Sequence, residues 1–284
     1  MKKEIRLTFL VLGLILTIAS YPLLLHIRNG QSDVLVISIC LIGFVVHSRG
    51  HKVASAALFA IATLLKVSPV LFLVYFVIFL QDLRFGVSFC IATAVLILLS
   101  LLVVPLEFYA DYFVNILPYV SGGTSYWLNQ SILKFFAENE TLAKVISSVG
   151  FGLFALFAWF LARKIASLDR SPRVRLGENG FIAEGVFLMN LLVILIFAGK
   201  AWSMSYVWTI LPSALLLALL LDARPKEWYL GVVVLAVFLL TSKVYGFPFL
   251  DSLNLYGSVI LVGCLALWLL KRDWLLKQGV EPAQ

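Results

Sequence analysis

The chain is a succession of apolar runs, most of them between about 13 and 21 residues long, separated by short polar segments. A helix of about 20 apolar residues crosses a bilayer. Because 62% of the residues are hydrophobic and 13% are charged, against about 25% charged in soluble domains, no soluble core could bury this excess. The pattern predicts an all-α, polytopic transmembrane helix bundle of about 9 to 10 membrane segments. We predict one integral membrane domain over 1–284, with segments at 5–25, 34–47, 53–66, 69–81, 86–104, 146–166, 180–199, 203–221, 228–242 and 256–270.

The runs 53–66 and 69–81 form an exception, because Ser68-Pro69 separates them. Proline lacks a backbone donor and disfavours helical geometry in the residue before it. Two short helices that meet near Lys66 therefore fit better than one long helix. We expect either a broken helix or a re-entrant hairpin over 53–81, since unwound backbone at membrane depth is tolerated beside protein or water.

The basic residues indicate how the chain is oriented. With a cytoplasmic N-terminus and a hairpin at 53–81, the cytoplasmic segments hold 16 of the 22 lysines and arginines, as the positive-inside rule requires. A single crossing at 53–81 would instead place the Arg163–Arg175 cluster outside. The net charge of +7 therefore reports topology, and we expect no nucleic-acid partner. We predict a cytoplasmic tail at 271–284 and extracytoplasmic segments at 26–33, Lys66, 105–145, 200–203 and 243–255.

The extracytoplasmic loop 105–145 has a mixed character. Acidic and aromatic residues alternate from Glu107 to Phe113, which is typical of a helix lying at the membrane interface. Pro118 and the Gly122-Gly123 pair then interrupt this pattern. We therefore expect interfacial helices in the loop rather than a further crossing.

Polar residues that follow apolar runs are the candidates for a binding site. Lys66 would cost about 2.5 to 3.5 kcal/mol in hydrocarbon, and its ammonium suits a phosphate. The alternative is a lysine that reaches the interface from a short helix.

Asn129-Gln130-Ser131 follows Tyr126-Trp127 and could bind sugar hydroxyls beside a stacking ring, although a helix cap would look the same. Trp202 and Tyr206 also suit an ordinary aromatic belt. No nucleotide-binding or metal-ligand pattern is present in the sequence, so we expect no cofactor and no metal.

Several of these segments, in this order, resemble glycosyltransferase family 87. These are multi-pass enzymes of the GT-C type that use polyprenyl-phosphate sugars, often of mannose. The family tends to show a Gly-Gln-x-Asn element, a Lys-x-x-Pro element at the re-entrant turn and an Asn-Gln-Ser element in the outer loop. The resemblance runs from about residue 20 to 215 and rests on Tyr21-Pro22, Arg28 to Asp33, Leu65 to Pro69, Asn129 to Ser131, Trp202-Ser203 and Leu211-Pro212.

The chain departs from the family pattern in three places. Only 29 residues precede Gly30, whereas the family usually has further helices and an acidic catalytic loop there. Asp33 stands where the Gly-Gln-x-Asn element has asparagine. Tyr206 and its neighbours stand where members often carry histidine. We expect one of three explanations: a start upstream of this sequence, a separate polypeptide that supplies the missing part, or a reduced relative.

The resemblance implies a membrane glycosyltransferase that moves a hexose, mannose above all, from a polyprenyl-phosphate donor to an extracytoplasmic glycan or lipid acceptor. It would lie in the cell membrane among membrane lipids. Asp33 is the candidate base, with Glu107 and Asp111 as competitors. The alternatives are a non-catalytic or truncated partner subunit, and a transporter or flippase with an anion site at Lys66. The candidate substrate-binding residues are Gln31, Lys66, Asn129, Gln130, Ser131, Trp202 and Tyr206.

Overall fold

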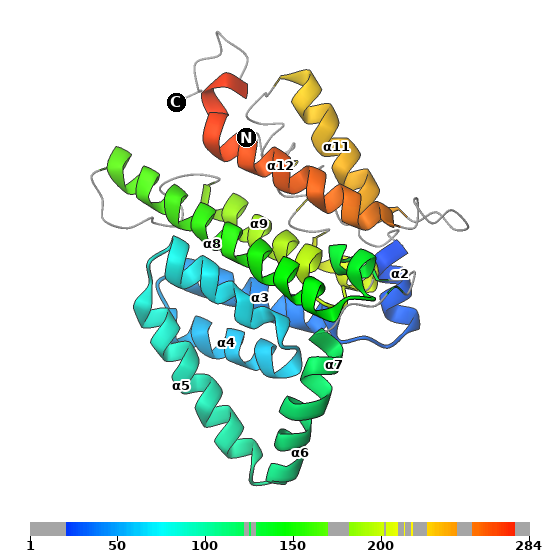
Figure 1. Cartoon of the computed structure of the whole chain (residues 1–284). Coiled ribbons are helices and arrows are strands. Elements are labelled where there is room, and N and C mark those ends of the chain that lie inside the picture. Colours follow the sequence, from blue (N-terminus) through cyan, green and yellow to red (C-terminus); the bar gives the residue numbers. More distant parts are fainter. Residues whose placement is uncertain are drawn as a thin grey trace. The chain divides into compact units, whose positions relative to one another are not determined.

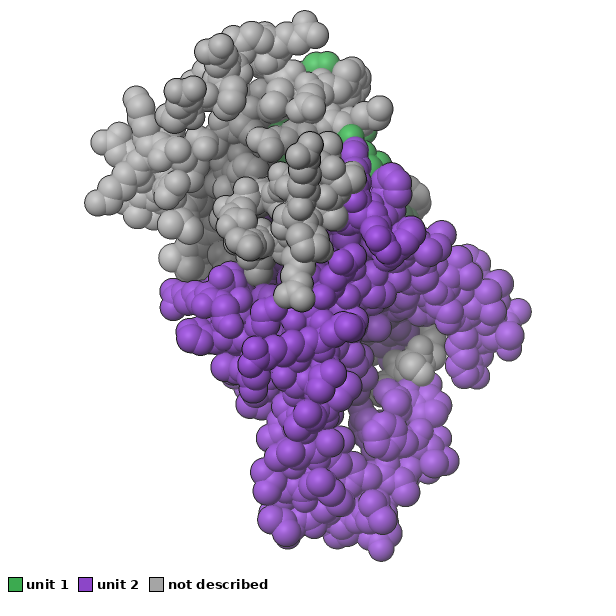
Figure 2. Space-filling view, turned by 90° about the vertical axis from the view of Figure 1, so that its left-hand side faces the viewer, with its two compact units in different colours: residues 1–30, 202–284 green, residues 31–201 purple. Residues whose placement is uncertain are grey.

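The computed structural model of the chain divides into two compact units. Unit 1 comprises Met1–Gly30 and Trp202–Gln284, and unit 2 comprises Gln31–Ala201 (Figure 2). The described residues are helical apart from turns and short links, which confirms the predicted all-α membrane helix bundle. The prediction of a single domain over 1–284 stays a prediction. The structure describes residues 21–121, 125, 129–169, 182–201, 203–209, 213, 217, 226–242 and 252–275.

Unit 2 begins with two antiparallel helices, α3 (Asp33–Ser48) and α4 (Lys52–Leu65) (Figure 1). Gly50 connects them with a left-handed φ of 88°, which glycine adopts without steric cost. The helices approach closely at Gly43, where a Cβ atom would lie 2.8 Å from the Phe59 ring. At the same level, the Ser55 hydroxyl donates a 2.7 Å hydrogen bond to the Gly43 carbonyl. Small residues thus bring the two backbones together, as is common between membrane helices.

The predicted break after α4 is confirmed. Lys66 ends the helix in an extended conformation, with φ −157° and ψ 127°. The chain continues as a 3₁₀ helix, η1 (Ser68–Phe72), which has Pro69 in its first turn, and then as a π-helix, η2 (Val74–Phe79). Asp82, just beyond η2, forms an ion pair with Lys52 at the start of α4, with 2.5 Å between the lysine nitrogen and the carboxylate oxygen. The segment therefore leaves and returns to the same end, as a hairpin does.

This hairpin defines two ends of unit 2. We name them the Lys66 end, where α4 stops and α3 starts, and the Asp82 end, where α3 stops and α5 (Leu83–Ser100) starts. Asp82 caps α5, because its side chain accepts a 3.2 Å hydrogen bond from the backbone N–H of Phe85. Gln81 precedes the cap with a φ of 53°, a rare conformation for a residue other than glycine.

Aromatic side chains fill the centre of unit 2. The rings of Phe76 and Phe85 stack with their centroids 3.8 Å apart, and Phe72 stacks on Phe187 at 4.8 Å. Phe187 belongs to α9 (Ile182–Phe197), in which every residue from Gly185 to Ile196 is buried. Such pairs add to the stability that their buried area provides. The hairpin is therefore packed against α9 and not only against its neighbours in sequence.

The remaining elements of unit 2 connect α5 to α9. From the far end of α5 the chain turns back through α6, η3 and α7 (Figure 1), which lie in the loop predicted at 105–145. Their position at a membrane interface stays a prediction. The long helix that follows starts six residues before its predicted limit, because the Asn139 side chain caps it by accepting from Leu142 N–H at 2.9 Å. These elements are α6 (Leu106–Asp111), η3 (Tyr112–Ile116), α7 (Leu117–Ser121), η4 (Ile132–Phe136) and α8 (Glu140–Asp169).

Unit 1 is built around the pair α11 (Glu227–Thr241) and α12 (Leu253–Leu275), with α2 (Tyr21–Arg28) in contact with η5 (Ser203–Tyr206). Asn254 donates to the carbonyl of Leu240 at 2.6 Å and so closes the end of α11. Helix α12 continues through the first five residues of the predicted tail. Most of the segments predicted at 5–25 and 203–221, and the rest of the tail, lie outside the described residues.

Three of the described helices, α5, α8 and α12, are long and apolar enough to cross a membrane. Helix α5 is the most exposed of the three, with 11% of its apolar window buried. The other apolar helices are shorter, and α3, α4 and the hairpin segments pack on one another. The composition and these helices identify a membrane protein.

Candidate functional site

An ion pair between Asp33 and Lys66 lies at the Lys66 end of unit 2. Asp33 is the first residue of α3 and Lys66 follows the last residue of α4, so the antiparallel packing of the two helices brings them together. The Asp33 side chain is 2% exposed and that of Lys66 is 31% exposed. A carboxylate so buried among apolar helices needs a cationic partner. The candidate base and the candidate phosphate-binding cation are therefore partners in one ion pair.

The backbone around this pair is open on one side. Gly30 turns the chain into α3 with a φ of 59°, and Gln31 and Ser32, which precede Asp33, are exposed. The Asp33 carboxylate also lies at the positive end of the α3 dipole, which favours its negative charge. Gln31 is thus accessible from solvent beside a buried carboxylate. The predicted neighbours Gln31, Asp33 and Lys66 do come together in one region.

The Asn129-Gln130-Ser131 segment is buried and is braced against the residues that follow α9. The Asn129 side-chain oxygen accepts from the backbone N–H of Ala201 at 3.0 Å and from that of Ser131 at 3.2 Å. The Gln130 N–H donates to the Ala201 carbonyl at 2.7 Å, and the Asn129 amide donates to Gly199 at 3.3 Å. Asn129 thus holds two distant segments together. Its predicted role with a sugar stays a prediction.

Lys200 lies between two residues whose backbone is bonded to Asn129, and its contacts were not predicted from the sequence. Its ammonium lies 3.5 Å from the centroid of the Tyr119 ring and donates a 2.8 Å hydrogen bond to the Tyr119 carbonyl. In the part of the chain that the structure describes, Lys200 forms no ion pair. It therefore brings an uncompensated positive charge next to the Asn129 segment. Its position in the predicted extracytoplasmic segment 200–203 was the available sequence signal.

The other predicted residues are placed as follows. Glu107 and Asp111 are exposed on α6, and Asp111 accepts a 2.7 Å hydrogen bond from Asn115. Neither carboxylate is buried like that of Asp33, so they lie in a more solvated setting. Tyr206 is buried within unit 1. Trp202 lies outside the described residues.

The ion pair supplies a buried carboxylate and a lysine in contact with it. A carboxylate can accept a proton from a hydroxyl group, and an ammonium can stabilise the charge of a phosphate leaving group. Both are requirements of a displacement at a sugar carbon that carries a phosphate. The two groups are in contact, so they cannot act independently of each other.

Comparison with protein families finds a match to glycosyltransferase family 87 over residues 3–178, more than half of the chain. The match includes Asp33, Lys66 and the Asn129 segment but ends before Lys200. It confirms the resemblance seen in the sequence. No curated protein and no solved structure matches the chain.

Proposed function

Since the chain belongs to glycosyltransferase family 87 and is thus a membrane glycosyltransferase, we propose that it transfers a hexose from a polyprenyl-phosphate donor at the Lys66 end of unit 2. The acceptor is an extracytoplasmic glycan or lipid, and mannose is the first sugar to test. The observation that carries the proposal is the ion pair between the buried carboxylate of Asp33 and Lys66.

We place the Lys66 end on the extracytoplasmic face. This orientation is supported by the basic residues, because Arg49, Lys52 and Arg84 all belong to the opposite, Asp82 end. Positive charge collects on the cytoplasmic side of membrane proteins. The hairpin further supports this orientation. Because the hairpin starts and finishes at the Asp82 end, the basic residues Arg163 and Lys164 of α8 fall on the same side as that end.

In the proposed reaction, an acceptor hydroxyl attacks the anomeric carbon of the donor. A bond forms between the acceptor oxygen and that carbon while the bond from the carbon to the phosphate oxygen breaks. The hydroxyl proton passes to the Asp33 carboxylate, and the polyprenyl phosphate leaves with its new charge beside Lys66. The polar segment around Asn129 and the side chain of Gln31 bind sugar hydroxyls.

The ion pair adds a coupling between donor binding and catalysis. Before the donor binds, Lys66 neutralises Asp33, so a hydroxyl that approaches the carboxylate competes with the ammonium for its oxygen atoms. The anionic phosphodiester of the donor draws Lys66 toward itself, because it competes with the carboxylate for the ammonium group. Asp33 is then released to accept the proton of the acceptor. The base thus becomes available only when the donor is in place.

The test is transfer of radiolabelled mannose from polyprenyl-phosphate mannose, with other polyprenyl-phosphate hexoses run in parallel. The enzyme is the full chain in proteoliposomes. We expect Lys66→Met and Asp33→Asn to reduce transfer by about a hundredfold or more, as expected when a group that acts in the transition state is removed. Lys144→Gln is the matched control. It removes another lysine paired with an acid, Glu140 at 2.6 Å, but that pair is exposed.

A double variant, Asp33→Asn with Lys66→Met, separates catalysis from structure. Breaking a buried pair on one side costs about 3 to 5 kcal/mol, whereas replacing both partners is often neutral. A structural pair would therefore regain transfer in the double variant, and that result would overturn the proposed roles. We expect a folded double variant without transfer. Absence of transfer by the unchanged chain with every donor would instead favour a partner subunit or an anion transporter.

A further inference from the structure

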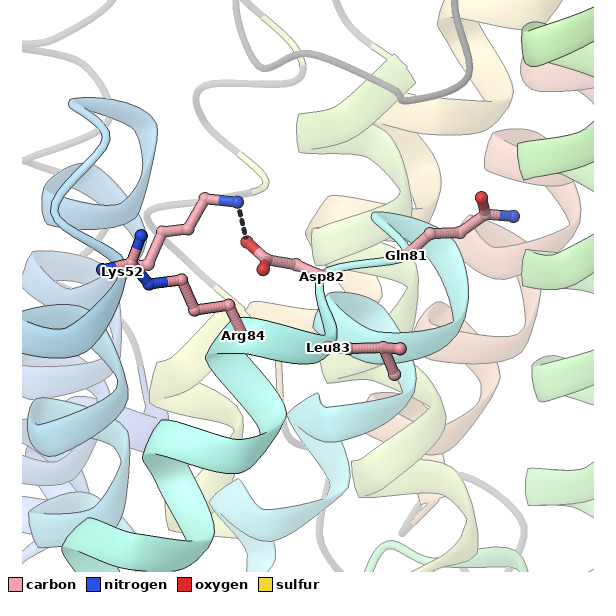
Figure 3. Close-up of a pocket in the computed structure, with 5 residues that line it drawn as sticks. All are labelled: Lys52, Gln81, Asp82, Leu83 and Arg84. Carbon is pink, nitrogen blue, oxygen red and sulfur yellow. Dashed lines mark ion pairs between the residues drawn. The ribbon is translucent and has the colours of Figure 1, made fainter.

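A pocket of about 440 Å³ lies at the Asp82 end of unit 2 (Figure 3). The ion pair of Asp33 and Lys66 belongs to the opposite end. It forms where the return of the hairpin meets the starts of α4 and α5. The proposed transfer reaction does not use it. Its lining residues are Lys52, Gln81, Asp82, Leu83 and Arg84.

The charges in this pocket do not cancel. The Asp82 carboxylate forms an ion pair with Lys52 at 2.5 Å and a hydrogen bond with Nε2 of His47 at 3.0 Å. Its negative charge is therefore already compensated. Arg84 forms no ion pair with any residue that the structure describes. Figure 3 shows its side chain extending toward Lys52, whereas Gln81 points away from the Lys52–Asp82 pair. One positive charge therefore remains for an outside anion.

An apolar stripe rises from the pocket along α5. Leu83 is 70% exposed, and Val87 and Ile91 follow at four-residue intervals with 60% and 59% exposed. Residues spaced in this way lie on one face of a helix. Because α5 is long and apolar enough to cross a membrane, an exposed apolar stripe along it is suited to contact with lipid chains. A pocket at the start of such a helix is in the position that a lipid headgroup requires.

We propose that this pocket binds the phosphate of an anionic glycerophospholipid, whose acyl chains lie along the stripe of Leu83, Val87 and Ile91. Arg84 contacts the phosphate, because the planar guanidinium presents two parallel donors that match phosphate oxygens. The bound lipid joins the starts of α4 and α5 to the end of the hairpin. With the orientation given above, the lipid belongs to the cytoplasmic leaflet, and only this assignment rests on the proposed function.

The test measures lipid retention on the full chain, purified in detergent and stripped of native lipid. The protein is titrated with dioleoylphosphatidylglycerol, dioleoylphosphatidylcholine or inorganic phosphate, and the bound molecules are counted by native mass spectrometry. We expect tighter retention of phosphatidylglycerol than of phosphatidylcholine. Arg84→Gln should weaken phosphatidylglycerol retention about tenfold, the typical effect of losing a charge-assisted hydrogen bond.

Arg163→Gln is the matched control. Like Arg84, Arg163 is exposed and forms no ion pair with the described residues. Its guanidinium lies 5.5 Å from the centroid of the Trp159 ring. We expect this variant to retain lipid as the unchanged chain does. Equal losses in both variants would show general attraction to positive charge and overturn the proposal. Equal retention of the two lipids would also overturn it, and so would displacement of the lipid by millimolar phosphate, which would mark a site for a soluble anion. Because lipid retention does not depend on transfer, failure here leaves the proposed function untouched.

Discussion

The packing of α11 on α12 gives a prediction whose size follows from the structure. Gly257 lies on α12 where a Cβ atom would meet the Ala236 carbonyl oxygen at 2.6 Å and the Leu240 nitrogen at 2.8 Å. Both atoms belong to the backbone of α11, so no side-chain rotation can relieve the contact. Gly257→Ala must therefore push the helices apart. An ordinary contact of about 3.5 Å requires roughly 0.9 Å of separation, which forfeits about a quarter to a half of the dispersion energy across the gap.

The expected loss of stability follows from two opposing contributions. Overpacking costs about 1 to 3 kcal/mol, and alanine recovers about 0.5 to 1 kcal/mol of helix propensity relative to glycine. We expect a net loss of about 1 to 2 kcal/mol. For a chain of this size that corresponds to a fall in Tm of about 3 to 6 °C. Thermal unfolding of the full chain in detergent, followed by tryptophan fluorescence, measures it.

The same helix provides the control. Gly263 lies six residues further along α12, and a Cβ atom there would meet nothing within 4 Å. Gly263→Ala should therefore leave Tm unchanged or raise it slightly through helix propensity alone. If Gly257→Ala melted at the same temperature as Gly263→Ala, the close approach of α11 and α12 would be refuted. Loss of stability in both variants would point instead to a general intolerance of alanine in α12.

Three further predictions concern other contacts. Asn254→Ala should destabilise unit 1 by about 1 kcal/mol in thermal unfolding, because the Asn254 amide donates to the carbonyls of Leu240 and Ser242. Asn254→Asp should destabilise unit 1 more than Asn254→Ala does, because a carboxylate would face these carbonyls. Equal Tm values for the two variants would contradict the proposed hydrogen bonding by the amide. Burial raises the pKa of Asp82, but hydrogen bonds from Lys52, Phe85 and His47 outweigh it and hold that pKa below its usual value of 3.8. The ionised Asp82 should therefore stabilise the fold above about pH 4, and this stabilisation should be lost as the pH falls through the lowered pKa. Asp82→Asn should be less stable at neutral pH and should lack this part of the acid sensitivity. If Tm varied with pH in the same way for both proteins, the stabilising role of ionised Asp82 would be excluded. Lys200→Met should speed hydrogen exchange of the α7 amides by about threefold to tenfold, because the cation–π contact and hydrogen bond to Tyr119 are lost; unchanged exchange would show that Lys200 does not hold α7.

Helix positions were largely predictable from the sequence. The apolar run at 34–47 became α3 at Asp33–Ser48, and Ser68-Pro69 marked the break after α4. Hydropathy carries this information because bilayer thickness fixes the length of a spanning helix. The first turn of α8 was missed because it is polar. Its signal was a capping residue, Asn139, rather than an apolar run.

The contacts of the candidate site were less predictable. Asp33 and Lys66 were assigned to one face of the membrane, but their pairing depends on the register of α3 against α4 across 33 residues. Lys200 and Tyr119 are separated by 81 residues, and the chain has no periodic pattern that relates them. Asn129 was predicted to bind sugar hydroxyls from the extracytoplasmic loop, and its hydrogen bond with the backbone of Ala201 had no signal in the sequence. Residue types indicate what a side chain can do, whereas packing decides which partner it meets.

The hairpin between Lys52 and Asp82 has a consequence for how such a gene can change over time. Deleting, duplicating or lengthening this segment would leave every later helix pointing the same way, because the chain enters and leaves the hairpin at one end. Loss of a single helix would turn all subsequent loops to the other compartment. A change in the length of this segment therefore leaves the orientation of α5 and of every later helix unchanged.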